Sequence, residues 1–423
     1  MKIYFKSLIK FQIFFLLIIE GAISLLHIPS YIRYVADINF LCIAVWNLSD
    51  IKKNRTKAAL SKESRLMQGY IIFVMIALIM IAIFKFVPIG QIFWGCRNAF
   101  FPIIFGLICL KKLELHDFEN IMDSVVKLQV LNVLCGIYEF FVLDVHNDYL
   151  GGMFGTSQGC NGALNVYLVI ITAFTLSQYM ANRQCFKTIA WVLISSILLA
   201  TCAELKVFYV ELILIVLLCI INSKKGAKSF VISISIFVVL ILGLIIFTNS
   251  SSSESAEILV SFDKMFEYNS RGDYGGDIVI SRLTSFDQIN QLFFKNNKWL
   301  KLLGFGLGGC EDSQTFSFCN SEFATRYGIT RYRSLTVAMD YLEWGYIGLA
   351  LFLMIFVGIF LMMFKFHKNE KYNYLATFCQ LMCVIYIIGC WYDSAIRSTI
   401  AYVMFFSLSS AFMLTKEYQE EVI

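Results

Sequence analysis

The chain has 423 residues, of which 58% are hydrophobic and 15% are charged, with a net charge of +5 and a mean hydropathy of +0.71. Soluble domains are about 45–50% apolar and about 25% charged, so this chain has too few charged residues to cover a folded surface in water. The composition excludes disordered, disulfide-scaffold and DNA-binding proteins, and it predicts an all-α polytopic membrane protein.

Spanning helices are the first predicted elements, because about 20 mostly apolar residues cross a bilayer with every backbone polar group paired. Twelve such windows occur, at about 8–28, 31–49, 69–87, 91–110, 124–143, 161–179, 188–203, 206–222, 229–248, 345–364, 373–391 and 398–414. The first window resembles a signal peptide, but no small-residue cleavage site follows, so we expect an uncleaved first span. Glu204 and Lys206 favour two spans over one long helix at 188–222.

The distribution of lysine and arginine predicts the orientation. If the N-terminus is cytoplasmic, 20 basic residues fall in the inner segments, and only Arg33, Lys85, Lys206 and Arg397 lie near the short outer turns. Basic residues stay on the cytoplasmic side of short loops. We therefore expect a multi-pass protein with both termini in the cytoplasm.

A long insertion interrupts the series of windows. Residues 249–334, called the insertion from here on, contain no spanning window and are expected outside, where 9 basic and 10 acidic residues suit a partly folded extracytoplasmic loop. The insertion separates a first bundle of about nine spans (1–248) from the last three spans and a cytoplasmic tail (335–423). A second outer loop, at about 144–160, is short and rich in glycine, and loops of this kind often carry chemistry.

Charged residues gather near the outer ends of the predicted spans, where each charge is costly and is therefore a functional hypothesis. They are Arg97, Glu139, Glu204, Lys206, Glu211, Asp340, Glu343, Asp393 and Arg397. Mutual pairing is the alternative interpretation, for example Asp393 with Arg397 one helical turn away. A transporter more often places such groups near the midplane, so the clustering predicts a binding or reaction site at the outer face.

Two features of the insertion suggest an anion site. Gly304, Gly306 and Gly308 belong to a glycine run, which is either a flexible loop or a turn that presents backbone N–H groups to an anion. The second feature is the arginines, because a guanidinium group suits bidentate contact with phosphate. The alternative for Arg271 and Arg282 is a solvated surface charge. The alternative for the second cluster, Arg326, Arg331 and Arg333, is contact with anionic lipid headgroups.

No metal or cofactor site is predicted. The four histidines lie on different segments, and the sequence contains no phosphate-binding glycine-lysine loop, nucleophile elbow or His-Glu-x-x-His motif. Cys310 and Cys319 are close enough in the insertion for a disulfide in an oxidising exterior. Two free thiols, or a pairing that involves Cys160, remain open alternatives.

Short stretches of sequence carry a family resemblance. Ser-Arg at 281–282 precedes Leu-Gly-Phe-Gly-Leu-Gly at 303–308, and Tyr-Leu-Glu-Trp-Gly-Tyr-Ile-Gly-Leu at 341–349 follows where the chain returns to the membrane. Gly-Met-Phe-Gly-Thr at 152–156 precedes the sixth span, and Lys206 begins the eighth. With a large outer loop late in a twelve-span chain, this pattern resembles the bacterial O-antigen and capsular repeat-unit polymerases (Wzy-type), which are relatives of the O-antigen ligases.

The resemblance implies metal-independent glycosyl transfer at the outer face of the bacterial cytoplasmic (inner) membrane. A glycan on undecaprenyl pyrophosphate would move to a new lipid-linked repeat unit, with membrane lipids, a flippase and a chain-length regulator as partners. Arg271, Arg282 and Lys206 would stabilise the leaving pyrophosphate, and Asp340, Glu343 or Glu139 would act on the acceptor hydroxyl. The residues that would bind substrate are Arg97, Glu139, Gly304, Gly306, Gly308 and Arg333.

The sequence departs from this family in two places. Ligases and many polymerases carry His-Asn shortly before the Glu-x-Gly-x-x-Gly stretch, where this chain has Arg333-Ser334-Leu335, and no histidine occurs in the insertion. The arginine-to-glycine spacing of some polymerases is also missing after Arg271 and Arg282. The missing histidine argues against the ligase. A transporter or flippase of lipid-linked oligosaccharide and a non-catalytic scaffold are the alternatives from other classes.

Overall fold

The fold was determined as a computed structural model, which describes residues 2–53, 61–223, 261–274, 277–313 and 315–422. Helices dominate this part of the chain, where the only strands are β1 (Asp273–Tyr274) and β2 (Asp277–Ile278), paired antiparallel. The helical fold class is therefore confirmed. The ninth predicted window, 229–248, lies outside the described residues.

The described helices follow the order of the predicted windows. In the first bundle they are α1 (Lys2–Leu25), α2 (Tyr34–Lys53), α3 (Lys62–Phe84), α4 (Ile89–Ala99), α5 (Phe101–Lys112), α6 (Leu115–Lys127), α7 (Gln129–Phe141), α8 (Cys160–Met180), α9 (Phe186–Cys202) and α10 (Lys206–Ile221). The insertion contains α13 (Phe262–Ser270), α14 (Ser285–Leu292), α15 (Lys298–Leu303) and α16 (Glu322–Tyr327). The chain ends with α17 (Thr336–Met363), α18 (Asn373–Tyr392) and α19 (Ala401–Val422).

Six helices among the described residues are long and apolar enough to cross a membrane, namely Tyr4–Leu25, Lys62–Phe84, Leu115–Phe141, Cys160–Met180, Thr336–Lys368 and Asn373–Tyr392. The pair α4 and α5 is a seventh candidate, bent by 52° at a break where Pro102 in the first turn of α5 has no backbone N–H to donate. Helices α9 and α10 have only 17 and 16 residues, and α2 and α19 carry charged residues near their ends. The apolar helices are compatible with a multi-pass membrane protein, and the count of twelve spans stays a prediction.

Helix α8 lies at the centre of the bundle, and 89% of its apolar window is buried. Aromatic rings from four helices meet beside it: Phe118 of α6 lies 6.2 Å from Phe174 of α8 and 5.0 Å from Phe406 of α19, and Phe174 lies 5.3 Å from Phe378 of α18. Such pairs contribute about 0.5–1.5 kcal/mol each beyond the area that they bury. The early and late helices therefore share one core.

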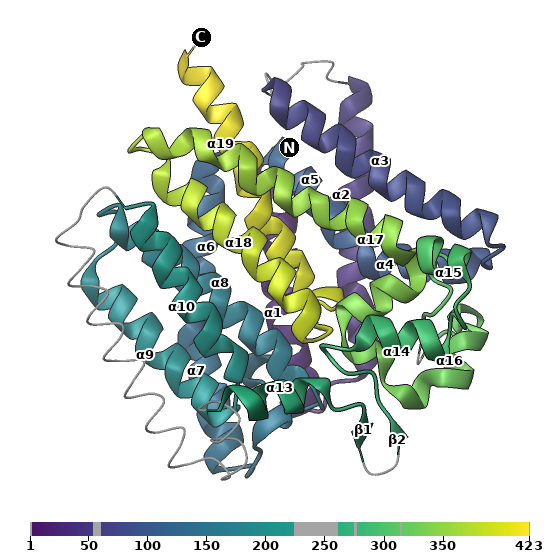
Figure 1. The fold of residues 1–423 in the computed structure, drawn as a ribbon. Helices are drawn as coiled ribbons and strands as arrows, with labels where there is room; N and C mark the ends of the chain where they lie inside the picture. The colour runs from purple at the N-terminus through teal and green to yellow at the C-terminus, as the bar shows by residue number, and fades with distance from the viewer. Residues whose placement is uncertain (1, 54–60, 224–260, 275–276, 314, 423) are drawn as a thin grey trace.

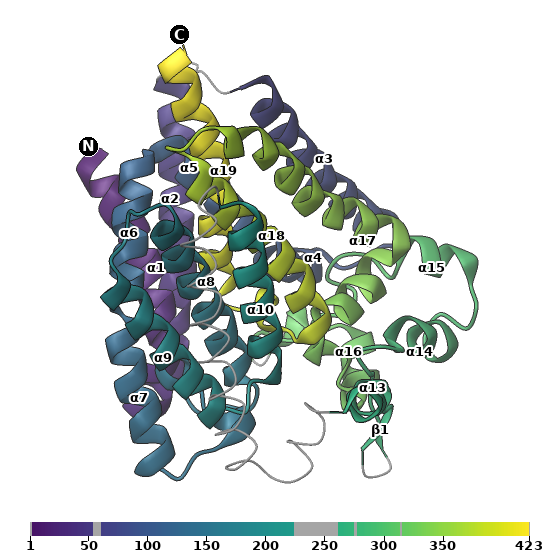
Figure 2. The ribbon, with the colours of Figure 1, turned by 60° about the vertical axis from the view of Figure 1, so that its left-hand side comes forward.

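Both termini lie at one end of the bundle, and α13, β1 and β2 lie at the other, which we call the insertion end (Figure 1). The second view shows the same separation, with α13 to α16 grouped beside the lower part of α17 (Figure 2). The connection from α9 to α10, predicted as a tight turn, spans Ala203 to Leu205 and also lies at this end, because α10 runs back toward the termini.

Helix α17 is broken at Gly345, whose φ of 62° and ψ of −171° depart from helical values. A side chain is strained at such a positive φ, and an added Cβ would lie 2.4 Å from the carbonyl carbon of Leu302. The break leaves two carbonyl groups of the preceding turn without helical donors, and the insertion supplies them: Phe305 N–H donates to Leu342 O and Gly306 N–H to Glu343 O, both at 2.8 Å. The break in α17 therefore provides the backbone acceptors that hold the insertion against this helix.

Candidate active site

A cavity of about 840 Å³ lies at the insertion end of the bundle, between the ends of α1, α8 and α18 and the insertion. Its described lining includes six arginines (Arg33, Arg97, Arg271, Arg282, Arg331 and Arg397) and four carboxylates (Glu20, Asp37, Asp148 and Asp393). Of the predicted site residues, Arg97, Arg271 and Arg282 line this cavity. The excess of guanidinium groups makes it suited to an anion.

Two of these arginines are neutralised within the wall. Arg97 donates from Nε and Nη2 to Asp37 Oδ2 at 3.0 and 2.8 Å, and Arg33 Nε lies 2.9 Å from Glu20 Oε1. A paired arginine contributes shape and hydrogen-bonding capacity, but little net charge. Arg97, predicted to bind substrate, is therefore a wall residue whose charge is matched.

Arg282 has a different environment. Its Nε donates to the carbonyl of Tyr392 at 2.8 Å, and its guanidinium carbon lies 4.7 Å from the ring of Tyr392 and 5.9 Å from the ring of Tyr268. Among the described residues, no carboxylate forms an ion pair with it. Lys206 Nζ lies 5.0 Å from the same Tyr268 ring, so Arg282 and Lys206 contact one aromatic side chain, although Lys206 is not in the cavity lining. Cation–π contacts hold both groups without cancelling their charge.

Arg271 and Arg331 complete the basic wall from the insertion. Arg271 is exposed, and its Nη2 is 3.9 Å from Glu267 Oε1, a separation at which a surface ion pair contributes little. Arg331 is also exposed, and its backbone has a left-handed φ of 53°. Both side chains are available to a ligand that enters the cavity.

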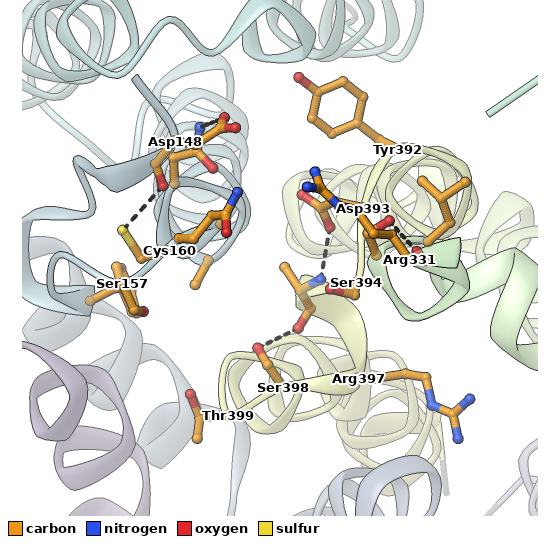
Figure 3. A pocket seen from close by; sticks show the side chains of 18 of the residues that line it. Asp148, Ser157, Cys160, Arg331, Tyr392, Asp393, Ser394, Arg397, Ser398 and Thr399 are labelled. Carbon is orange, nitrogen blue, oxygen red and sulfur yellow. Dashed lines mark hydrogen bonds between the residues drawn. The ribbon is translucent and has the colours of Figure 1, made fainter. Parts of the chain in front are cut away.

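The turn after α18 forms the polar wall of the cavity. Figure 3 shows Tyr392, Asp393, Ser394, Ser398 and Thr399 on this turn, facing a side that carries Asp148, Ser157 and Cys160. Asp393 Oδ1 accepts from Ala395 N–H at 2.8 Å. Burial raises the pKa of Asp393 to about 6, against the opposing effects of that hydrogen bond and of Arg282. A carboxyl group with such a pKa can exchange a proton near neutral pH.

Arg397 lines the cavity, but its guanidinium group is held by three carboxylates. Nη2 lies 2.8 Å from Glu311 Oε1 and 3.0 Å from Glu343 Oε2, and Nη1 lies 3.1 Å from Asp340 Oδ1. The Glu311, Asp340 and Glu343 side chains are 6%, 2% and 0% exposed and that of Arg397 is 10% exposed, so the group is buried. We call these four residues the Arg397 clasp. Burial lowers and the three carboxylates raise the pKa of Arg397, with a net increase, so the guanidinium stays charged.

The alternative interpretation, in which Arg397 pairs with Asp393, is not what the structure shows. Asp393 ends α18 in an extended conformation (φ −152°, ψ −167°), and residues Ala395–Arg397 form a separate 3-10 turn. The two residues therefore do not share a helix, and their four-residue spacing does not bring their side chains together as it would within one helix. The Arg397 clasp also bears on Asp340 and Glu343, which were predicted to act on the acceptor hydroxyl. Both side chains bind Arg397 behind the cavity wall, and neither lines the cavity.

The N–H groups of the glycine run do bind a carboxyl group, but this group belongs to the protein itself. Gly308 N–H and Cys310 N–H donate to Glu343 Oε1 at 2.9 and 3.3 Å, Gly306 N–H donates to the backbone of Glu343, and Gly304 N–H donates to Leu300 O. The prediction that these glycines present free N–H groups to a substrate is therefore wrong. Positive φ values of 66°, 95° and 84° at Gly304, Gly306 and Gly308 explain why glycine stands there.

Two other residues that were predicted to bind substrate, Glu139 and Arg333, contact other parts of the protein instead. Glu139 is buried, and its Oε2 accepts from Gly151 N–H at 3.1 Å and Gly152 N–H at 2.6 Å, so it holds the 144–160 loop and is not in the cavity lining. Arg333 forms a short ion pair with Asp312 on the surface of the insertion. Neither residue reaches the cavity.

The cysteines of the insertion are free thiols, and Cys310 and Cys319 are both buried. Burial raises the pKa of each thiol, which makes it unreactive. The expected absence of a metal site is not contradicted: within the described residues no group of three His, Cys, Asp or Glu side chains is arranged to hold an ion.

The sequence placed Arg397 and Asp393 among the charges near the outer ends of the spans, but it assigned neither of them a role in the reaction. Glu311 and Asp148 carried no distinguishing signal in the sequence, whereas Arg331 was named only as one of several arginines of the insertion. In comparisons with known proteins, no family model and no curated protein matches this chain. A function must therefore be argued from the cavity itself.

Proposed function

We propose that this protein polymerises undecaprenyl-pyrophosphate-linked oligosaccharide repeat units into O-antigen or capsular polysaccharide at the outer face of the bacterial inner membrane. The observation that carries the proposal is the cavity at the insertion end, whose wall holds arginines that no carboxylate neutralises among the described residues, beside hydroxyl and carboxylate groups. That combination fits a substrate with a pyrophosphate at one end of a sugar.

Departure of a lipid pyrophosphate concentrates negative charge, which fixed cations stabilise best when they are already in place. Arg282 has the most suitable surroundings, because Tyr392 and Tyr268 hold its guanidinium group without an opposite charge. Arg271 and Arg331 contribute from the rim, and Lys206 contributes from its position beside Tyr268. These four residues supply the positive charge in the proposed reaction.

The acceptor hydroxyl needs a group that takes its proton. Asp340 and Glu343 are engaged by Arg397, so we assign this role to Asp393, which lines the cavity and has a pKa of about 6. The acceptor oxygen attacks the anomeric carbon of the donor glycan, the bond from that carbon to the pyrophosphate oxygen breaks, and Asp393 accepts the hydroxyl proton. Undecaprenyl pyrophosphate leaves with the electron pair of the broken bond.

The proposal includes twelve spans with cytoplasmic termini. The termini lie at the end of the bundle opposite to the cavity, as this orientation requires (Figure 1). Reporter fusions after about residues 60, 115, 225 and 370 should read cytoplasmic, and fusions near 155 and 300 should read external. A cytoplasmic signal at 300 would remove the outer face as the place of the reaction.

The decisive experiment is reconstitution with native substrate. Lipid-linked repeat units are extracted from cells that lack this protein and are incubated with the purified protein in lipid nanodiscs. Polymerisation should give longer glycans on undecaprenyl pyrophosphate together with released undecaprenyl pyrophosphate, and Lys298→Ala, at an exposed side chain, should behave like the wild type. Transfer of glycan only to a lipid A core would identify a ligase. Movement of unextended repeat units across a vesicle membrane would identify a transporter.

A further inference from the structure

We infer that Arg397 is a positioning residue that fixes the insertion over the cavity by joining three separate segments of the chain. Glu311 comes from the insertion, Asp340 and Glu343 come from the part of α17 before its break, and Arg397 comes from the turn between α18 and α19. One guanidinium group contacts all three carboxylates. The expected effect of Arg397 on turnover rests on the proposed function. The expected effect of Arg397 on the position of the insertion is independent of that function.

Arg397 connects the clasp directly to the cavity wall. The next two residues, Ser398 and Thr399, line the cavity, and in Figure 3 the Arg397 side chain extends to the side opposite Thr399. A shift of Arg397 therefore moves the backbone that carries these two hydroxyl groups. Asp393 precedes it on the same turn, and Tyr392 is the last residue of α18, so the proposed base and one ring that holds Arg282 are joined to the same anchor through a short stretch of backbone.

Neutral donors complete the cluster around the carboxylates. Asn98 Nδ2 donates to Glu311 Oε2 at 3.0 Å, and the N–H groups of Gly308 and Cys310 donate to Glu343 Oε1. The only cation paired with these carboxylates among the described residues is Arg397. Breaking a buried ion pair by removing one partner is strongly unfavourable, because it leaves the other charge buried and unpaired.

The insertion is also held by apolar contacts with α17, and these must be separated from the effect of the clasp. Phe286 and Phe294 lie 4.7 and 5.3 Å from the ring of Tyr341. These rings do not involve Arg397, so they remain in any variant of the clasp. If these rings and the backbone hydrogen bonds of Phe305 and Gly306 to α17 position the insertion without the clasp, loss of Arg397 will not change the protection of residues beside Glu343.

Cys310 reports on the clasp, because it is fully buried and its N–H group is bound to Glu343. The experiment measures labelling of purified protein by N-ethylmaleimide, with each cysteine quantified by peptide mass spectrometry. In the wild type, Cys310 should label slowly and exposed Cys185 quickly. In Arg397→Gln, labelling of Cys310 should accelerate by a factor on the order of 10² while that of Cys185 stays constant.

Matched variants decide the interpretation. Arg333→Gln breaks an exposed ion pair of the same insertion and should leave Cys310 protected. Arg397→Lys keeps the charge but loses the planar fork, and it should restore protection in part. If Arg397→Gln does not accumulate, Glu311→Gln provides the same measurement with Arg397, Asp340 and Glu343 still paired, and should accelerate labelling by about tenfold.

Unchanged labelling of Cys310 in both Arg397→Gln and Glu311→Gln would overturn the inference. The reconstitution assay distinguishes this failure from failure of the proposed function. If wild-type protein does not lengthen repeat units but Arg397→Gln still exposes Cys310, the polymerase proposal fails and the positional role of Arg397 stands. If the wild type lengthens repeat units and Arg397→Lys gives products shorter than those of the wild type, the clasp positions the groups that act in turnover.

Discussion

Arg397 and Arg282 line the same cavity, yet their guanidinium groups have opposite surroundings. Arg397 pairs with three buried carboxylates, whereas Arg282 contacts a backbone carbonyl and two tyrosine rings and forms no ion pair among the described residues. An arginine whose charge is paired with carboxylates stabilises the protein. An arginine that is held only by neutral groups still has an unpaired charge, which a bound anion can use. The partners of an arginine, more than its presence in a cavity, therefore indicate its role.

The largest expected effect is on stability at Arg397. Arg397→Ala leaves three buried carboxylates without their cation and should lower the free energy of unfolding by about 3–5 kcal/mol. Arg282→Ala removes no ion pair and should change it far less. Thermal unfolding of both variants in the same detergent measures the difference. Equal losses of stability would contradict the contrast between the two arginines.

The next effect is on turnover at Arg282. Arg282→Ala should reduce the rate of repeat-unit lengthening by about 10²–10³, because a preorganised charge is lost from the leaving pyrophosphate. Arg282→Lys should recover part of the rate, since the charge remains but the bidentate fork does not. Glycan chain length on gels, with protein level as reference and Lys298→Ala as control, is the measurement. If Arg282→Ala still makes full-length polymer, Arg282 is not needed to stabilise the leaving pyrophosphate, and Arg271, Arg331 and Lys206 become the candidates for this role.

A smaller effect concerns the pH dependence of stability at Asp393. Its pKa in the folded protein, about 6, lies above the ordinary value of 3.8, so the folded state binds this proton more tightly than the unfolded state. The resulting stabilisation is complete below pH 3.8 and is lost as the pH rises through about 6, with a slope of at most about 1.4 kcal/mol per pH unit. Asp393→Asn should remove this part of the slope. Identical stability profiles between pH 4.5 and 7 would show that Asp393 titrates normally.

The smallest effect is expected at the exposed pair of Arg333 with Asp312. Arg333→Gln should change the free energy of unfolding by about 0–1 kcal/mol, because solvent screens both charges. The same unfolding measurement applies, at low and high salt. A loss as large as that of Arg397→Ala would mean that burial does not explain the difference between the ion pairs.

The positions of the helices outside the insertion could be predicted, because these helices correspond to apolar runs and charged residues flank most of these runs. The separation of α9 from α10 followed from Glu204 and Lys206, and Lys206 does begin α10. The break in α17 was not predicted, since Gly345 stands in an otherwise uninterrupted helical pattern and its positive φ depends on Leu302 and on the insertion. Contacts between distant segments decide such a feature.

The candidate site was predicted only in part for the same reason. Residue type indicated that arginines and carboxylates near the outer ends of spans would matter, and Arg271 and Arg282 do line the cavity. Spacing along the chain offered only Asp393 as an alternative partner for Arg397, but its partners are Glu311, Asp340 and Glu343, which precede it by 86, 57 and 54 residues. No local pattern in the sequence contains these pairings.

That separation along the chain sets an order during synthesis. Glu311, Asp340 and Glu343 all leave the ribosome before Arg397, and the whole of α18 is made in between. Until the turn before α19 emerges, the Arg397 clasp cannot form. Burial of an unpaired carboxylate is costly, so until then these three groups stay hydrated or become protonated. Closure of the Arg397 clasp therefore waits for the turn before α19, and a nascent chain arrested after α18 should leave its insertion accessible to proteases.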